Sequence, residues 1–165
     1  MPSDTWTAPA DWTTNEVVTA AKLNQQLRDN IYALWLAITT GSAAITETFS
    51  SGTYTPTLTN GTNVAASTAY QCQWMRIGSV VTVSGKVDID PTSAGLITGL
   101  GISLPVASNF GASEDCAGTS SGGVAGDNVS GAISGSIASD FASLNYTPAS
   151  AANQGCFFVF TYQVI

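Results

Sequence analysis

The side chains that most often carry out catalysis are scarce in this sequence, and their spacing assembles no reactive group. There is no histidine, so a serine or cysteine nucleophile has no imidazole base within the chain. The cysteines, Cys72, Cys116 and Cys156, are far apart, and no two have the C-x-x-C spacing of redox or zinc motifs. We therefore expect three buried thiols in a protein that is not an enzyme and uses no cofactor.

The acidic residues offer no better starting point for catalysis or metal binding. The 11 carboxylates are scattered, and neither Asp88 with Asp90 nor Glu114 with Asp115 supplies the ligand count of a recognised calcium site. The glycine-rich run 116–128 lacks the Lys-Ser or Lys-Thr of a phosphate-binding loop. We expect no metal site, and the run is predicted to be a loop.

The composition limits the possible partners. Charged residues make up only 9% of the chain, against roughly 25% in an average soluble protein. Four basic residues and a net charge of −7 disfavour nucleic-acid binding. No stretch approaches the ~20 apolar residues that span a bilayer, and no signal-peptide pattern is present, so no membrane insertion is expected. Because the surface carries so few charges, identical copies could bury part of it against one another, and self-association is expected.

Residues 1–40 are predicted to form an extended arm followed by a helix. The arm carries Trp6 and Trp12 in a proline-bearing stretch without periodicity, so it should order only by docking its indoles. Either the indoles bind in grooves of another protein, or they cap the helix of this chain. Thr19 is a suitable helix N-cap, and apolar positions then recur at helical intervals as far as about Ile38. These positions are Leu23, Leu27, Asn30 or Ile31, and Leu34. Either parallel helices associate through them, with Asn30 fixing the register, or one helix packs on the following domain.

A linker is predicted over residues 41–51, and an antiparallel β-sandwich of jelly-roll type over residues 52–165, because short β-rich runs alternate with turn residues there. The candidate strands are 54–58, 69–77, 80–89, 101–104, 113–119, 129–137, 141–145 and 157–164. The third alternates clearly, which predicts a buried face of Val81, Val83, Gly85, Val87 and Ile89. Trp74 and Arg76, just before it, are expected to be a core side chain and a strand-end charge.

Two parts of the chain resemble a known class of protein. The run WTTNEVVTA from Trp12, followed by LRDN from Leu27, resembles the N-terminal segment of phage virion proteins that begins small tail-fibre or receptor-binding chains. The succession YTPTL from Tyr54, WMRIGSVVTVSGKV from Trp74, ISLP from Ile102 and FVFTY from Phe158 is similar to a β-domain at the C-terminal ends of phage tail fibres.

This resemblance implies a short homotrimeric fibre on the tail or capsid surface of a virion. It implies a virion-docking set of Trp6, Trp12, Leu23, Leu27, Arg28 and Asn30, and a trimer helix formed through Leu23, Leu27, Asn30 and Leu34. Arg28 and Asp29, adjacent on the helix, are expected to face different directions, with Arg28 reaching an acid on another copy or on a tail, baseplate or capsid protein. The β-domain would contact a host-surface glycan or protein. The alternative is a capsid-decorating or baseplate-fastening protein without a receptor.

Overall fold

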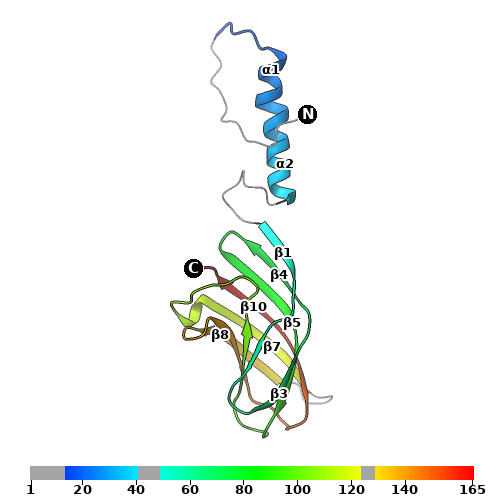
Figure 1. Ribbon diagram of the computed structural model, residues 1–165, viewed down its shortest axis with the longest axis vertical. Helices are drawn as coiled ribbons and strands as arrows, with labels where there is room; N and C mark the ends of the chain where they lie inside the picture. The colour runs from blue at the N-terminus through cyan, green and yellow to red at the C-terminus, as the bar shows by residue number, and fades with distance from the viewer. Residues whose placement is uncertain (1–13, 41–48, 124–128) are drawn as a thin grey trace. The chain divides into compact units, whose positions relative to one another are not determined.

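The computed structural model describes residues 14–40, 49–123 and 129–165 (Figure 1). The chain divides into two compact units, Met1–Ser50 and Ser51–Ile165, which we call the N-terminal unit and the β-unit. Trp6, Trp12 and most of the predicted linker lie outside the described residues.

The helix of the N-terminal unit begins at the predicted cap. The Thr19 hydroxyl accepts a hydrogen bond from the backbone N–H of Lys22 at 3.3 Å, which satisfies one of the free donors of the first turn. The helix then runs through α1 (Ala20–Leu23), a π-helical turn (Asn24–Asp29) and α2 (Asn30–Thr40). It ends two residues beyond the predicted position, and no sequence signal marks its π-helical turn.

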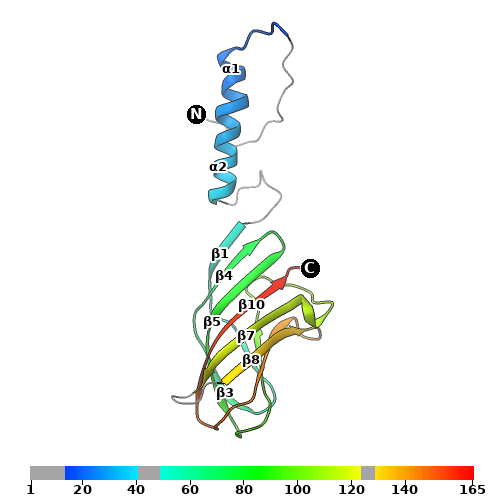
Figure 2. The same cartoon turned by 180° about the vertical axis from the view of Figure 1, so that it is seen from behind.

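The β-unit is an antiparallel sheet, as predicted. Its strands are β1 (Phe49–Tyr54), β2 (Leu58–Asn60), β3 (Val64–Ala69), β4 (Cys72–Ile77), β5 (Val80–Pro91), β6 (Thr98–Ser103), β7 (Cys116–Gly123), β8 (Val129–Ser136), β9 (Phe141–Tyr146) and β10 (Gln154–Gln163). They follow the order β1-β4-β5-β10-β7-β8-β9-β6-β2, with β3 also paired to β5. Figures 1 and 2 show β4, β5, β10 and β7 side by side.

The sheet curls so that its two halves face one another across one core. Strand β5 is long enough for two partners on the same edge: β4 pairs with its first half and β3 with its second. Strand β2 pairs with β6 at the far end of the sheet, and the turn from β2 to β3 bonds to the start of β6 through Gly61 N–H and the Gly99 carbonyl at 3.1 Å. The two ends of the sheet are therefore linked through this turn.

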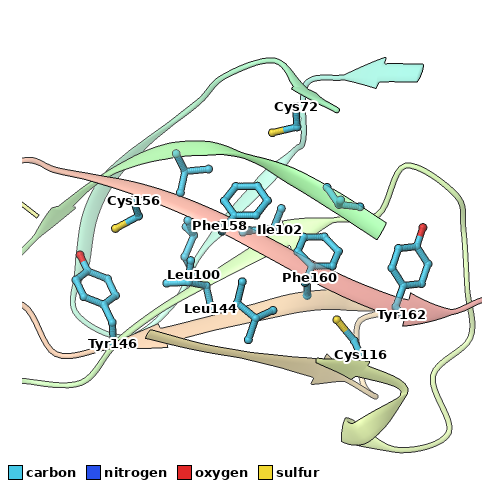
Figure 3. Close-up of a cluster of buried hydrophobic side chains, with 14 of the residues drawn as sticks. Cys72, Leu100, Ile102, Cys116, Leu144, Tyr146, Cys156, Phe158, Phe160 and Tyr162 are labelled. Carbon is cyan, nitrogen blue, oxygen red and sulfur yellow. The ribbon is translucent and has the colours of Figure 1, made fainter. Parts of the chain in front are cut away.

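The core confirms the predicted inner face of β5. Its side chains Val81, Val83, Val87 and Ile89 are fully buried. Strand β10 contributes Cys156, Phe158, Phe160 and Tyr162, and the opposite half of the sheet contributes Leu100, Ile102, Ile133 and Leu144. Figure 3 shows Phe158 and Phe160 side by side along β10, with Leu144 close to them. The core is thus one continuous cluster shared by both halves.

Several sequence predictions about the strands were wrong. The glycine-rich run 116–128 was predicted to be a loop, but Cys116–Gly123 form β7, whose glycines allow close approach of the β10 backbone. The predicted strand 54–58 is interrupted, because Pro56 has no N–H to donate to a ladder, and β1 ends at Tyr54 while β2 begins at Leu58. The predicted strand 69–77 is β4 preceded by the last residue of β3, a strand that the sequence pattern missed. The alanines and the serine of β3 have low β-propensity. Strand β3 therefore forms because β5 has a free edge with which it can pair.

Burial of ionisable core groups predicts a loss of stability at alkaline pH. Burial raises the pKa of the Cys116 thiol to about 12 and that of Cys156 to about 11, from a reference value of 9.0. These thiols ionise at a lower pH in the unfolded chain than in the folded protein. Their contribution to stability is therefore complete below about pH 9 and is lost as pH rises towards the folded-state pKa values.

We expect the free energy of unfolding, measured in urea, to be lower at about pH 10.5 than at about pH 8, by about 1.4 kcal/mol per pH unit for each such thiol once pH exceeds 9. A Cys116→Ala variant is the control, and it should show a shallower pH dependence than the unmodified chain. Equal stability at both pH values would contradict the prediction.

Candidate interaction surfaces

The helix presents most of its predicted association residues to solvent. Leu23, Leu27 and Leu34 are exposed in the single chain, whereas Asn30 is buried, with 5% of its surface accessible. Ala33, three residues farther on, is also buried. The structure therefore does not place Asn30 among the exposed leucines, although both belong to the predicted set.

The π-helical turn accounts for the position of the exposed stripe. A π turn closes i→i+5 hydrogen bonds and takes up about one residue more than an α turn, so residues four apart across it return to nearly the same side. Leu23, Leu27, Ile31 and Trp35 have this spacing, and all four are exposed. The Trp35 ring also stacks on Tyr32, with 5.8 Å between ring centroids. The helix thus carries an apolar stripe that ends in an aromatic pair.

Arg28 and Asp29 do not face different directions, and this prediction was wrong. The Arg28 Nε donates to Asp29 Oδ1 at 2.9 Å. Both residues lie in the π-helical turn, whose altered backbone allows neighbouring side chains to meet. The guanidinium is half exposed. Any acid on a partner would therefore share Arg28 with a carboxylate of its own chain.

A second surface lies on the β-unit. We use the name outer face for the side chains of β4, β5, β10 and β7 that point away from the core. Its exposed apolar members are Met75, Ile77, Val80, Phe157 and Val159. Thr82, Ser84, Thr119, Ser121 and Thr161 surround them. This set was not predicted from the sequence, although the run Cys156–Phe160 gave a signal, because strands with apolar residues on both faces are usually covered on both.

Two charged residues of this side, Lys86 and Asp88, form a closed cluster with Tyr70 at one end. Lys86 Nζ lies 2.9 Å from Asp88 Oδ1 and 4.5 Å from the Tyr70 ring centroid, and the Tyr70 hydroxyl donates to Asp88 Oδ2 at 2.6 Å. Burial alone would raise the pKa of Asp88, but hydrogen bonds from Lys86 and Tyr70 outweigh it and lower that pKa. The hydrogen bond to Asp88 raises the pKa of Tyr70 and that of Lys86. The cluster therefore holds an ion pair and offers no free base.

Trp74 and Arg76 have the structural roles predicted for them. Trp74 is half buried and packs against the core, and Gly52 lies close to its indole ring. The Arg76 Nε donates to the Gly78 carbonyl at 2.6 Å. Gly78 has a φ of +60° in the turn between β4 and β5, a conformation that favours glycine. Arg76 therefore stabilises the turn of this hairpin.

An open depression of about 860 Å³ lies over β7, β8 and β9 and the segment that follows β9. Its polar side chains belong to Thr119, Ser130, Asn145 and Thr147, and no charged side chain lines it within the described part of the chain. Hydroxyl and amide groups can donate and accept hydrogen bonds without a charge. The depression is thus chemically suited to a neutral polar ligand.

Nothing in the described ranges is arranged as a metal centre or a membrane span. Residues 14–40, 49–123 and 129–165 contain no group of three or more His, Cys, Asp or Glu side chains that could hold a metal ion. Within the same ranges, no helix has the length and apolar character needed to cross a bilayer. No protein-family model matches the sequence, and no curated protein or solved structure matches it either.

Proposed function

We propose that this chain is a phage virion fibre protein, a homotrimer that attaches to the particle through its N-terminal unit and adheres to the host surface through its β-unit. The observation that carries the proposal is the division of the chain into two compact units, each of which contains one of the two fibre-like sequence patterns. The helix with its exposed apolar stripe suits docking, and the charge-poor sheet suits contact with other molecules.

The adhesive role is supported by the depression over β7, β8 and β9. Its hydroxyl and amide groups match the hydroxyls of a neutral host glycan. An open site of this kind binds weakly, but several copies in one fibre and many fibres on one particle multiply the effect. Host adhesion therefore does not need a deep pocket or a charged ligand.

Deletion of residues 1–18 tests the attachment role, and it retains the Thr19 cap. We expect the shortened chain to keep the thermal unfolding of the β-unit but to be missing from assembled particles, because the docking arm has been removed. The matched variant is Asn145→Ala with Ser130→Ala, two residues of the depression, which should enter particles normally but reduce adsorption to host cells. Normal incorporation of the deletion variant would overturn the attachment role. Fragile particles with unchanged adsorption would indicate a decorating or fastening protein.

A further inference from the structure

We propose that the part of the outer face over β4, β5 and β10 is the surface on which a second copy of this chain packs. The inference rests on the self-association contained in the proposed function and identifies the surface that produces it. Three properties of the face support it: apolar residues on both sides of β10, the apolar area of the face, and a centre that carries no charged side chain.

Strand β10 is apolar on both of its faces at its centre. Phe158 and Phe160 point into the core, while Phe157 and Val159, which alternate with them along the strand, point outward and are 60% and 45% exposed. A half-buried antiparallel strand normally places polar residues on its outer face. The two outward side chains therefore match a strand that is covered on both sides, and the single chain covers only one.

The exposed apolar side chains are numerous enough for an interface. Five large side chains, each about half exposed, present roughly 500 Å² of apolar surface in two groups, a total comparable with the largest apolar patches on monomers. The intervening hydroxyl residues bring the face towards the roughly 800 Å² per partner of a stable interface.

Charge also favours this face for contact between identical copies. Copies with a net charge of −7 each repel one another unless they meet where charge is low. Lys86, which lies opposite Phe157, is compensated by Asp88, and Asp90 beyond them accepts a hydrogen bond from Asn153 at 2.7 Å. Met75, Thr82, Val159 and their outward neighbours are uncharged. Interface centres are depleted in charged residues and enriched in aromatic residues and methionine, which matches the composition here.

The arrangement of the apolar residues suits head-to-tail contact. Met75, Ile77 and Val80 lie at one corner of the face, and Phe157 and Val159 lie across it. Between them Thr82 and Thr161 pair through their hydroxyls at 3.1 Å. A depression of about 270 Å³ beside Met75 has room for a side chain such as Phe157 of the next copy. A corner-to-corner contact of two different patches forms a ring when the rotation between copies closes after a whole number of copies.

Thiol labelling of the full-length chain tests the proposal. Val159→Cys places a thiol on the outer face, and the control Ile137→Cys places one in the exposed turn between β8 and β9. The three native cysteines are buried, so they contribute little background. We expect a maleimide to label Val159→Cys about tenfold more slowly than Ile137→Cys, because only dissociated copies expose the face. Phe157→Cys gives a second reading at the same surface.

The native mass, measured by light scattering on the same samples, separates the outcomes. An oligomer with slow Val159→Cys labelling, which becomes faster on dilution, supports the proposal. An oligomer with equal labelling rates overturns the assignment of the face but leaves the homo-oligomer standing. A monomer with equal labelling rates overturns both the assignment of the outer face and the proposed homo-oligomer. A monomer with a protected Val159→Cys would show that the chain covers the face itself, which also contradicts the proposal.

Discussion

Replacing Asn63 with alanine is expected to lower the free energy of unfolding by about 4 kcal/mol, the combined effect of several lost hydrogen bonds and a strained backbone. The Asn63 Nδ2 donates to the Ser93 carbonyl at 2.9 Å and to Thr98 Oγ1 at 2.7 Å, and its Oδ1 accepts from the Ser93 N–H at 2.9 Å. Thr98 is fully buried. One side chain therefore joins the β2–β3 turn to the segment that leads into β6.

The backbone of Asn63 adds a second effect that can be measured separately. Its φ of +59° lies in the left-handed region, which asparagine tolerates and alanine does not. Asn63→Gly removes the same hydrogen bonds without this strain, so it should be less destabilising than Asn63→Ala by about 1 kcal/mol. Asn109→Ala, at an exposed asparagine, should change stability by less than about 0.5 kcal/mol. Urea denaturation of the three variants measures these differences, and equal losses in all of them would contradict the prediction.

Replacing Gly118 with alanine is expected to cost about 3 kcal/mol or more, because the added methyl group cannot be accommodated without moving backbone. It would lie 2.6 Å from Phe160 Cα and closer still to the Val159 carbonyl oxygen. These atoms belong to β10, which pairs directly with β7 at this point. Backbone atoms on a paired strand cannot turn away as the end of a side chain can.

Gly111→Ala is the matched control for Gly118→Ala. The nearest atom to its added methyl group would be Asp115 Oδ2, at 3.8 Å, which is an ordinary van der Waals distance. The expected change is within about 0.5 kcal/mol. Urea denaturation of both variants gives the comparison. Similar stabilities for the two would show that β7 can move away from β10 and that the close approach is not essential.

The sequence predicted those elements whose pattern is local. The alternation from Val81 to Ile89 identified the inner face of β5, and Thr19 marked the start of the helix. Strand β3 was missed because its formation depends on a free half-edge of β5, which no local pattern records. The π-helical turn was missed because no residue pattern marks it, and the Arg28–Asp29 pair within it was missed as well.

The apolar residues of the outer face could have been predicted from sequence only if it had been known which side of β10 faces the core. Phe157 and Phe158 are neighbours, and the run gives no indication of which of them faces the core. The register of β10 against β5 decides which of them is buried. Phe158 lies opposite Gly85 on the inner face of β5, and the missing side chain of Gly85 leaves room for Cys72 and for the Phe158 ring. Pairing therefore decides which aromatic residue is left on the surface.

The central place of β10 has a consequence for how the protein is made. This strand lies between β5 and β7, yet at least sixty residues separate it from β5 along the chain. Until Gln163 has left the ribosome, β5 and β7 have no partner along their inner edges, and aromatic residues of the core are missing. The sheet must therefore close after synthesis of this segment, in a slow step governed by distant contacts. A nascent chain that stops earlier exposes two unpaired strand edges, which are sites for aggregation.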